Sequence, residues 1–103
     1  MQDVVIVSTA RTPIGRAYRG AFNNLTAPTM GAIPIREAVA RSGVDPAEIE
    51  DVIFGATLTE GTAFSNVARR ASLAAGLPET TSGVTVSRAC SSGLQAIAFA
   101  AQR

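Results

Sequence analysis

Residues 84–94 read Val84-Thr85-Val86-Ser87-Arg88-Ala89-Cys90-Ser91-Ser92-Gly93-Leu94. The β-branched run up to Ser87 predicts a strand, and the apolar residues that follow Ser92 recur at helical spacing. Cys90, the only cysteine of the chain, lies between the two. The stretch therefore predicts a strand that turns directly into a helix, with a thiol at the junction.

A thiol in this position has two interpretations. It faces the positive end of a helix dipole and unpaired backbone N–H groups, both of which favour the nucleophilic thiolate. The same amides are suited to hold the oxyanion that forms when a thiolate attacks a carbonyl. A lone cysteine among alanines is, however, more often a small buried apolar residue. The small neighbours Ser91, Ser92 and Gly93 favour the nucleophile, because they leave space above the sulfur.

Outward from this junction, predicted strands and helices alternate along the chain. We expect strands at 4–7, 51–58 and 83–87, helices at 35–41, from 65–66 to Gly76 and from Ser92 onward, and one helical turn at 45–48. Pro34 either opens the first helix or kinks a longer one. The order βαβαβα predicts an α/β fold with a parallel sheet, right-handed crossovers and helices on the sheet faces. The third helix is apolar nearly all round, which predicts burial of most of its surface.

Composition limits the class of protein. Of 103 residues, 47% are hydrophobic and 17% charged, and the net charge is +1, which is typical of a globular protein without a nucleic-acid or membrane partner. The first residues lack the pattern of a signal peptide, and no apolar run reaches the roughly 20 residues of a membrane span. A single cysteine fits a reducing compartment. We therefore expect a cytoplasmic protein.

Histidine is absent from the sequence. Histidine is the usual general base for a cysteine nucleophile. If Cys90 is catalytic, its proton acceptor must be another side chain, such as a carboxylate, or a residue outside these 103.

Four parts of the sequence together resemble one known protein family. The run Cys90-Ser91-Ser92-Gly93-Leu94-Gln95-Ala96 resembles the nucleophile motif of thiolases. Further matches follow in the family's order: Val4-Val5-Ile6-Val7-Ser8 with Ala10-Arg11-Thr12-Pro13-Ile14-Gly15, then Asp51-Val52-Ile53-Phe54-Gly55, then Ala68-Arg69-Arg70-Ala71 with Ala75-Gly76-Leu77-Pro78. The resemblance covers the whole chain.

The resemblance implies an acyl-CoA C-acyltransferase in which Cys90 is the catalytic residue and carries the acyl group. Thiolases cleave 3-ketoacyl-CoA with coenzyme A or condense two acetyl-CoA units, so coenzyme A and acyl-CoA are expected as substrates. No permanently bound cofactor or metal is expected, since metal-ligand spacing, a dinucleotide fingerprint and a phosphate loop are all missing. The family fold has two βαβαβαββ halves in a five-layer αβαβα arrangement, usually as dimers or tetramers. Residues 1–103 would form the first part of the N-terminal thiolase domain.

The resemblance is incomplete in ways that matter for mechanism. The family's catalytic histidine, second cysteine, Asn-Glu-Ala-Phe segment and coenzyme A loop are absent, and Ser87 stands where many thiolases have asparagine. We expect these groups in the remainder of the polypeptide, because the sequence stops within a well-formed helix at Gln102-Arg103. Arg69 and Arg70 are candidates for the phosphates of coenzyme A, although a solvated or interface role is favoured.

Two alternatives remain at this point. A ketoacyl synthase of the same superfamily also uses a cysteine here, but the segment Arg11-Thr12-Pro13-Ile14-Gly15 speaks against it. The other is a thiolase-like acyl-CoA or lipid-binding protein without turnover. The 103 residues alone are expected to be inactive, held by the rest of their chain or by a partner subunit.

Overall fold

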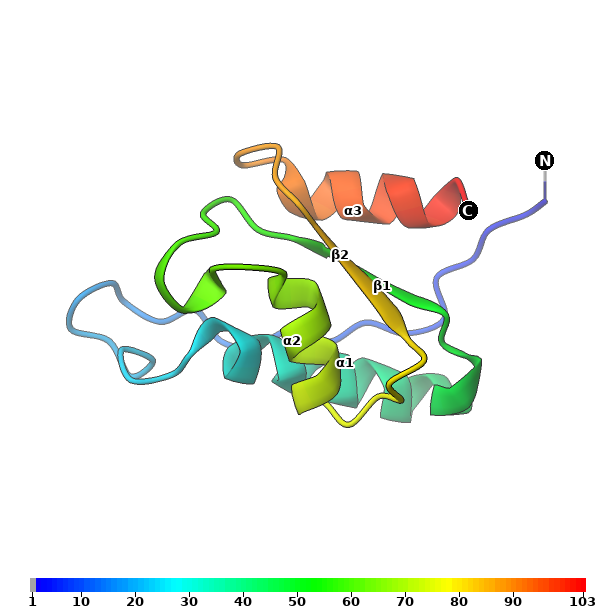
Figure 1. Ribbon diagram of the computed structural model, residues 1–103, viewed down its shortest axis with the longest axis horizontal. Coiled ribbons are helices and arrows are strands. Elements are labelled where there is room, and N and C mark those ends of the chain that lie inside the picture. The colour runs from blue at the N-terminus through cyan, green and yellow to red at the C-terminus, as the bar shows by residue number, and fades with distance from the viewer. Residues whose placement is uncertain (1) are drawn as a thin grey trace.

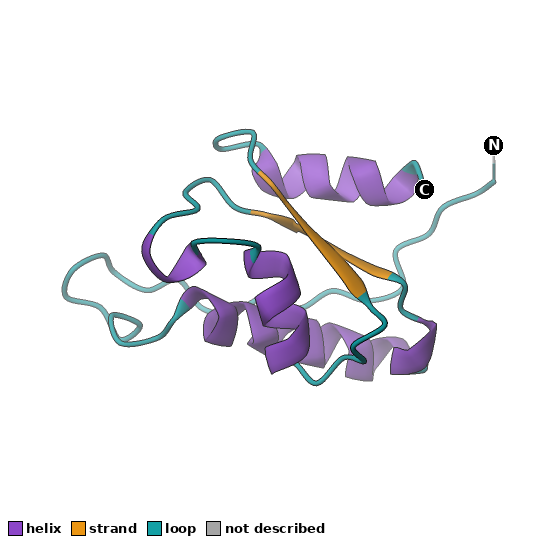
Figure 2. Ribbon diagram, viewed as in Figure 1, coloured by secondary structure: helices purple, strands orange, loops and turns teal. Residues whose placement is uncertain are grey.

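A computed structural model describes residues 2–103, which form three layers with a parallel sheet in the middle (Figures 1 and 2). The elements are α1 (Ala27–Ser42), a 3₁₀ turn (Pro46–Glu48), β1 (Asp51–Gly55), a second 3₁₀ turn (Gly61–Ala63), α2 (Val67–Ala74), β2 (Ser82–Val86) and α3 (Ser92–Ala101). Helices α1 and α2 pack together on one face of the sheet, and α3 lies on the opposite face (Figure 1). The expected α/β class is confirmed.

Strands β1 and β2 pair along their whole length and end at the same edge of the sheet. They pair in parallel from Asp51 opposite Ser82 to Gly55 opposite Val86. The N–H of Ala56 donates to the carbonyl of Val86 at 3.0 Å, so the pairing continues one step further. β1 ends three residues before the expected end at Leu58. The loops that leave both strands therefore start side by side at one edge of the sheet.

The helix ends follow local rules. Gly43, with φ of 71°, ends α1 in the left-handed conformation, and Asp45 caps the following 3₁₀ turn by accepting from the N–H of Ala47 at 2.9 Å. Asn66 caps α2 through the N–H of Arg69. Pro34 lies inside α1, so the structure contains the longer helix of the two alternatives.

The core is built from small side chains between α1, α2 and the sheet. Its most buried apolar residues are Ala32, Val67, Ala68, Ala71, Leu77 and Ala96. Five of these six lie in or directly after α1 and α2. Close packing is therefore concentrated on one face. No helix among residues 2–103 combines the length and apolarity needed to cross a membrane.

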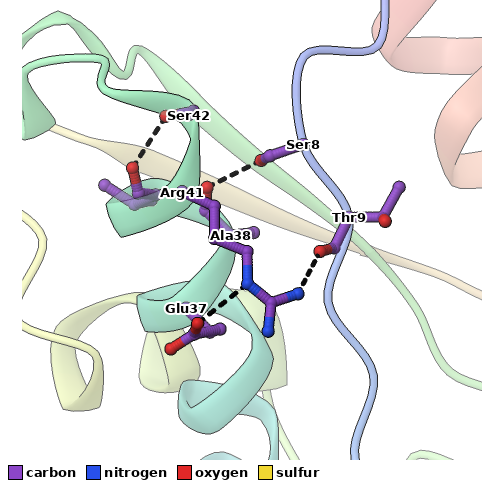
Figure 3. Close-up of polar contacts among 7 residues, drawn as sticks. Ser8, Thr9, Glu37, Ala38, Arg41 and Ser42 are labelled. Atoms are coloured by element: carbon purple, nitrogen blue, oxygen red, sulfur yellow. Dashed lines mark hydrogen bonds and ion pairs between the residues drawn. The ribbon is translucent and has the colours of Figure 1, made fainter.

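The expected first strand is not formed, and this prediction was wrong. Residues 4–7 have no strand partner, and their side chains are 58–75% exposed. The following residues are held by α1 instead: the hydroxyl of Ser8 donates to the carbonyl of Ala38 at 2.6 Å, and Arg41 donates to the carbonyl of Thr9 at 2.8 Å (Figure 3). A strand requires the backbone groups of a neighbour, which β-branched residues alone do not supply.

Helix α3 is covered on one side only, which corrects the expectation that most of it is buried. Ser92 and Ala96 are buried, whereas Leu94 and Ile97 are 73% and 56% exposed. A groove of about 630 Å³ runs between α3 and β1 and is lined by Ile53, Gly55, Ala96, Ile97 and Ala100, among others. Helix α3 therefore carries more apolar surface than the rest of residues 2–103 covers.

We predict that Gly55→Ala destabilises the full-length protein by about 1–3 kcal/mol, because a Cβ at residue 55 overlaps the start of α3. That Cβ would lie 2.6 Å from the nitrogen of Gly93 and closer still to the carbonyl of Ser92. Backbone atoms cannot move aside as a side chain can. Urea unfolding measures the effect. Gly93→Ala is the matched control, since a Cβ there meets nothing within 4 Å, and equal stability of the two variants would contradict the prediction.

Candidate functional site

The structure places Cys90 at the predicted junction, in the five-residue connection between β2 and α3. Its side chain is exposed within these residues. Ala89 has φ of 47°, a left-handed conformation that costs an L-residue about 1 kcal/mol. This turn sends the chain from the end of β2 into α3.

The first turn of α3 starts immediately after the thiol. Ser91 is the N-cap residue, and its side chain makes no capping hydrogen bond. The N–H of Ser91 donates to the carbonyl of Arg88 at 3.0 Å. We find no hydrogen bond from the N–H of Cys90 within residues 2–103. The amide nearest the sulfur is therefore free to bind an anion.

Two hydroxyl groups hold the turn. The hydroxyl of Ser92, a residue 2% exposed, accepts from the N–H of Arg88 at 2.8 Å and donates to the carbonyl of Ala89 at 2.6 Å. The hydroxyl of Thr57, from the loop after β1, donates to the same carbonyl at 2.8 Å. The end of β1 is thereby linked to the turn that carries Cys90.

Ser87 occupies a modest place in this junction. Its hydroxyl donates to the carbonyl of Thr57 at 3.3 Å, which is a long hydrogen bond at an exposed position. It touches neither Cys90 nor Ala89 through a hydrogen bond in the described chain. The Ser87 side chain therefore takes no direct part in holding the peptide between Ala89 and Cys90.

The two arginines of α2 are both engaged in holding loops. Nη1 of Arg70 donates to the carbonyls of Thr62 and Phe64 at 2.9 and 3.0 Å. Arg69 donates to two carbonyls of the connection between α2 and β2. Their guanidinium groups thus fix the ends of loops rather than standing free in solvent.

The hydrogen bond from Thr57 to the carbonyl of Ala89 is the contact that the sequence does not predict. Thr57 lies 32 residues before Ala89 and was expected within a strand. Its role follows only from the parallel register, which sets the exits of β1 and β2 next to each other. Ser92 was recognised as small, but its two hydrogen bonds were not anticipated.

The chain matches a known protein family along nearly its whole length. The family model described as "Thiolase, N-terminal domain" matches residues 4–103. The chain is 43% identical to the 3-ketoacyl-CoA thiolase of Bacillus subtilis, over 100% of this chain and 26% of that protein. It is 44% identical to an acetyl-CoA acetyltransferase of Cupriavidus necator, over 98% of this chain and 25% of that protein.

A solved structure gives the same result. The crystal structure of the Acat5 thiolase of Ascaris suum in complex with coenzyme A matches 98% of this chain and 26% of its own, with 37% identity and a TM-score of 0.90. The chain thus spans about a quarter of the length of the relatives it matches. The match to the family model over nearly every residue shows that this chain belongs to the thiolase family, as part of its N-terminal domain.

Proposed function

We propose that the whole protein is an acyl-CoA C-acyltransferase and that Cys90 is its acyl-accepting nucleophile. The observation that carries this proposal is the exposed thiol at the strand-to-helix junction of a thiolase N-terminal domain. The substrates are acyl-CoA thioesters. The reaction is either cleavage of 3-ketoacyl-CoA with coenzyme A or condensation of two acetyl-CoA units.

The proposed acylation uses the groups of the junction in a defined order. The Cys90 thiolate attacks the thioester carbonyl carbon, a carbon–sulfur bond forms, and the carbonyl electron pair moves to oxygen. The free N–H of Cys90 stabilises that oxyanion together with a donor from elsewhere in the chain. The electron pair returns, the bond to the coenzyme A sulfur breaks, and the leaving thiolate takes a proton from a group outside residues 1–103.

The remainder of the protein completes this segment in our proposal. It supplies the general base and the coenzyme A pocket, and it covers the exposed side of α3 and residues 4–7 within a five-layer αβαβα fold. Assembly as homodimers or homotetramers is part of the proposal. A cytoplasmic location is also part of the proposal.

We predict that Cys90→Ala in the full-length protein abolishes thioester-linked acylation by a labelled acyl-CoA, because the only sulfur nucleophile of this segment is removed. Intact-mass analysis after incubation with acetyl-CoA measures the adduct. Cys90→Ser is the isosteric control and must also form no thioester. Thioester-linked acylation that persists in Cys90→Ala would contradict the proposal.

Three further assays of the wild-type protein separate the competing functions. Binding of acyl-CoA by the wild-type protein without any adduct would indicate a non-catalytic binding protein. Decarboxylation of a malonyl thioester would indicate a ketoacyl synthase. Reversible cleavage of 3-ketoacyl-CoA that depends on coenzyme A would exclude both.

We predict that Arg70→Met lowers the free energy of unfolding by about 1 kcal/mol, since two loop carbonyls lose their donor. The affinity for coenzyme A should stay within about twofold, because the guanidinium serves the chain and not a phosphate. Urea unfolding and calorimetric titration with coenzyme A measure the two effects. Arg16→Met removes the same charge at another exposed arginine. A large loss of affinity specific to Arg70→Met would instead assign this residue to the phosphates.

A further inference from the structure

The carbonyl oxygen of Ala89 accepts three hydrogen bonds, which is more than a carbonyl oxygen needs to be satisfied. The hydroxyls of Ser92 and Thr57 donate to it at 2.6 and 2.8 Å, and the N–H of Ser92 donates at 3.2 Å. A carbonyl oxygen has two lone pairs, and Ala89 is exposed in this segment, so water could serve it as well. Three donors on one oxygen therefore require another explanation.

This carbonyl belongs to the same peptide group as the N–H of Cys90. The peptide is trans, so its C=O and N–H point in opposite directions. Donors that fix the oxygen on one side fix the direction of the Cys90 N–H on the other side. Donation to the oxygen also polarises the peptide and strengthens its N–H as a donor. That N–H makes no hydrogen bond of its own among the described residues.

We propose that Thr57 and Ser92 are positioning residues that orient and polarise the Ala89–Cys90 peptide, so that the Cys90 N–H binds the oxyanion formed during acylation. This inference rests on the proposed function of Cys90. Neither hydroxyl touches the substrate. Both act through the carbonyl of Ala89, one from the end of β1 and one from the first turn of α3.

The left-handed conformation of Ala89 explains why such support is needed. With φ of 47°, this residue gains about 1 kcal/mol by relaxing, and relaxation would rotate the peptide that follows it. Ser92 opposes the rotation from within the turn, since its hydroxyl bridges the Arg88 N–H and the Ala89 carbonyl. Thr57 opposes it from the neighbouring strand exit. Two independent elements thus hold one peptide plane.

The test compares two reactions of the same thiol in the full-length protein. Acylation by acetyl-CoA passes through an oxyanion, whereas alkylation by iodoacetamide is a direct displacement that forms none. Thr57→Val keeps the shape of an exposed side chain and removes its hydroxyl, so it is the first variant, and Ser92→Ala is the second. Thr57→Ser restores the hydroxyl. Ser82→Ala is the control, because it removes an exposed hydroxyl at the other end of β2 that bonds the carbonyl of Glu50 and reaches neither Thr57 nor Ala89.

We expect Thr57→Val and Ser92→Ala each to lower the acylation rate at saturating acetyl-CoA by about tenfold, which is less than the loss of a whole oxyanion donor. The KM should stay unchanged, and the alkylation rate should stay within about twofold. Thr57→Ser should recover the acylation rate, and Ser82→Ala should retain it.

Three results would overturn the inference. Unchanged acylation in both variants would show that the hydroxyls do not act on the peptide. An equal fall of acylation and alkylation would show a merely structural role for the turn. A wild-type protein that takes no acyl group on Cys90 would overturn the proposed function itself, and it is distinguishable because the first two results require an acylated wild type.

Discussion

The start of α3 lies directly against the end of β1 because residue 55 has no Cβ. A side chain there would overlap the backbone of Ser92 and Gly93. This close approach lets the Ser92 side chain be buried while its hydroxyl bridges two backbone groups of the turn. It also brings the exit of β1 near enough for Thr57 to reach the same turn. Gly55 in β1 thus allows the start of α3, and with it the turn that carries Cys90, to lie against the end of β1.

The position of the site relative to the packed core has a physical consequence. Small buried side chains of α1 and α2 cover one face of the sheet, whereas α3 on the other face keeps Leu94 and Ile97 largely in contact with solvent. Apolar surface stabilises in proportion to the area removed from water, at about 25 cal/mol per Å². Packing therefore contributes little to the turn before α3. Hydrogen bonds hold that turn instead, and they fix direction more tightly than non-directional apolar contact does.

The features that sequence analysis predicted correctly are those decided by near neighbours. The helical turn expected at 45–48 is one of them, because Asp45 caps it through the N–H of Ala47, only two residues away. Pro34 could not be assigned, because both alternatives satisfy local rules and only packing of α1 chooses between them. The strand expected at 4–7 was wrong because a strand requires the backbone of a partner strand, and residues 4–7 have none among residues 2–103. Cys90 was placed at its junction by local pattern alone.

The hydrogen bond between Thr57 and Ala89 cannot be predicted from the sequence, because the two residues are 32 positions apart. No property of Thr57 distinguishes it from its neighbours until the parallel register sets the two strand exits side by side. The left-handed Ala89 costs about 1 kcal/mol, and each of its supporting hydrogen bonds contributes about as much, so the turn is stable only while most of them are present. The geometry at Cys90 is accordingly set by three segments, namely the exit of β1, the turn after β2 and the first residues of α3. The local sequence predicts where the thiol lies, whereas the register of the sheet determines how the peptide beside it is held.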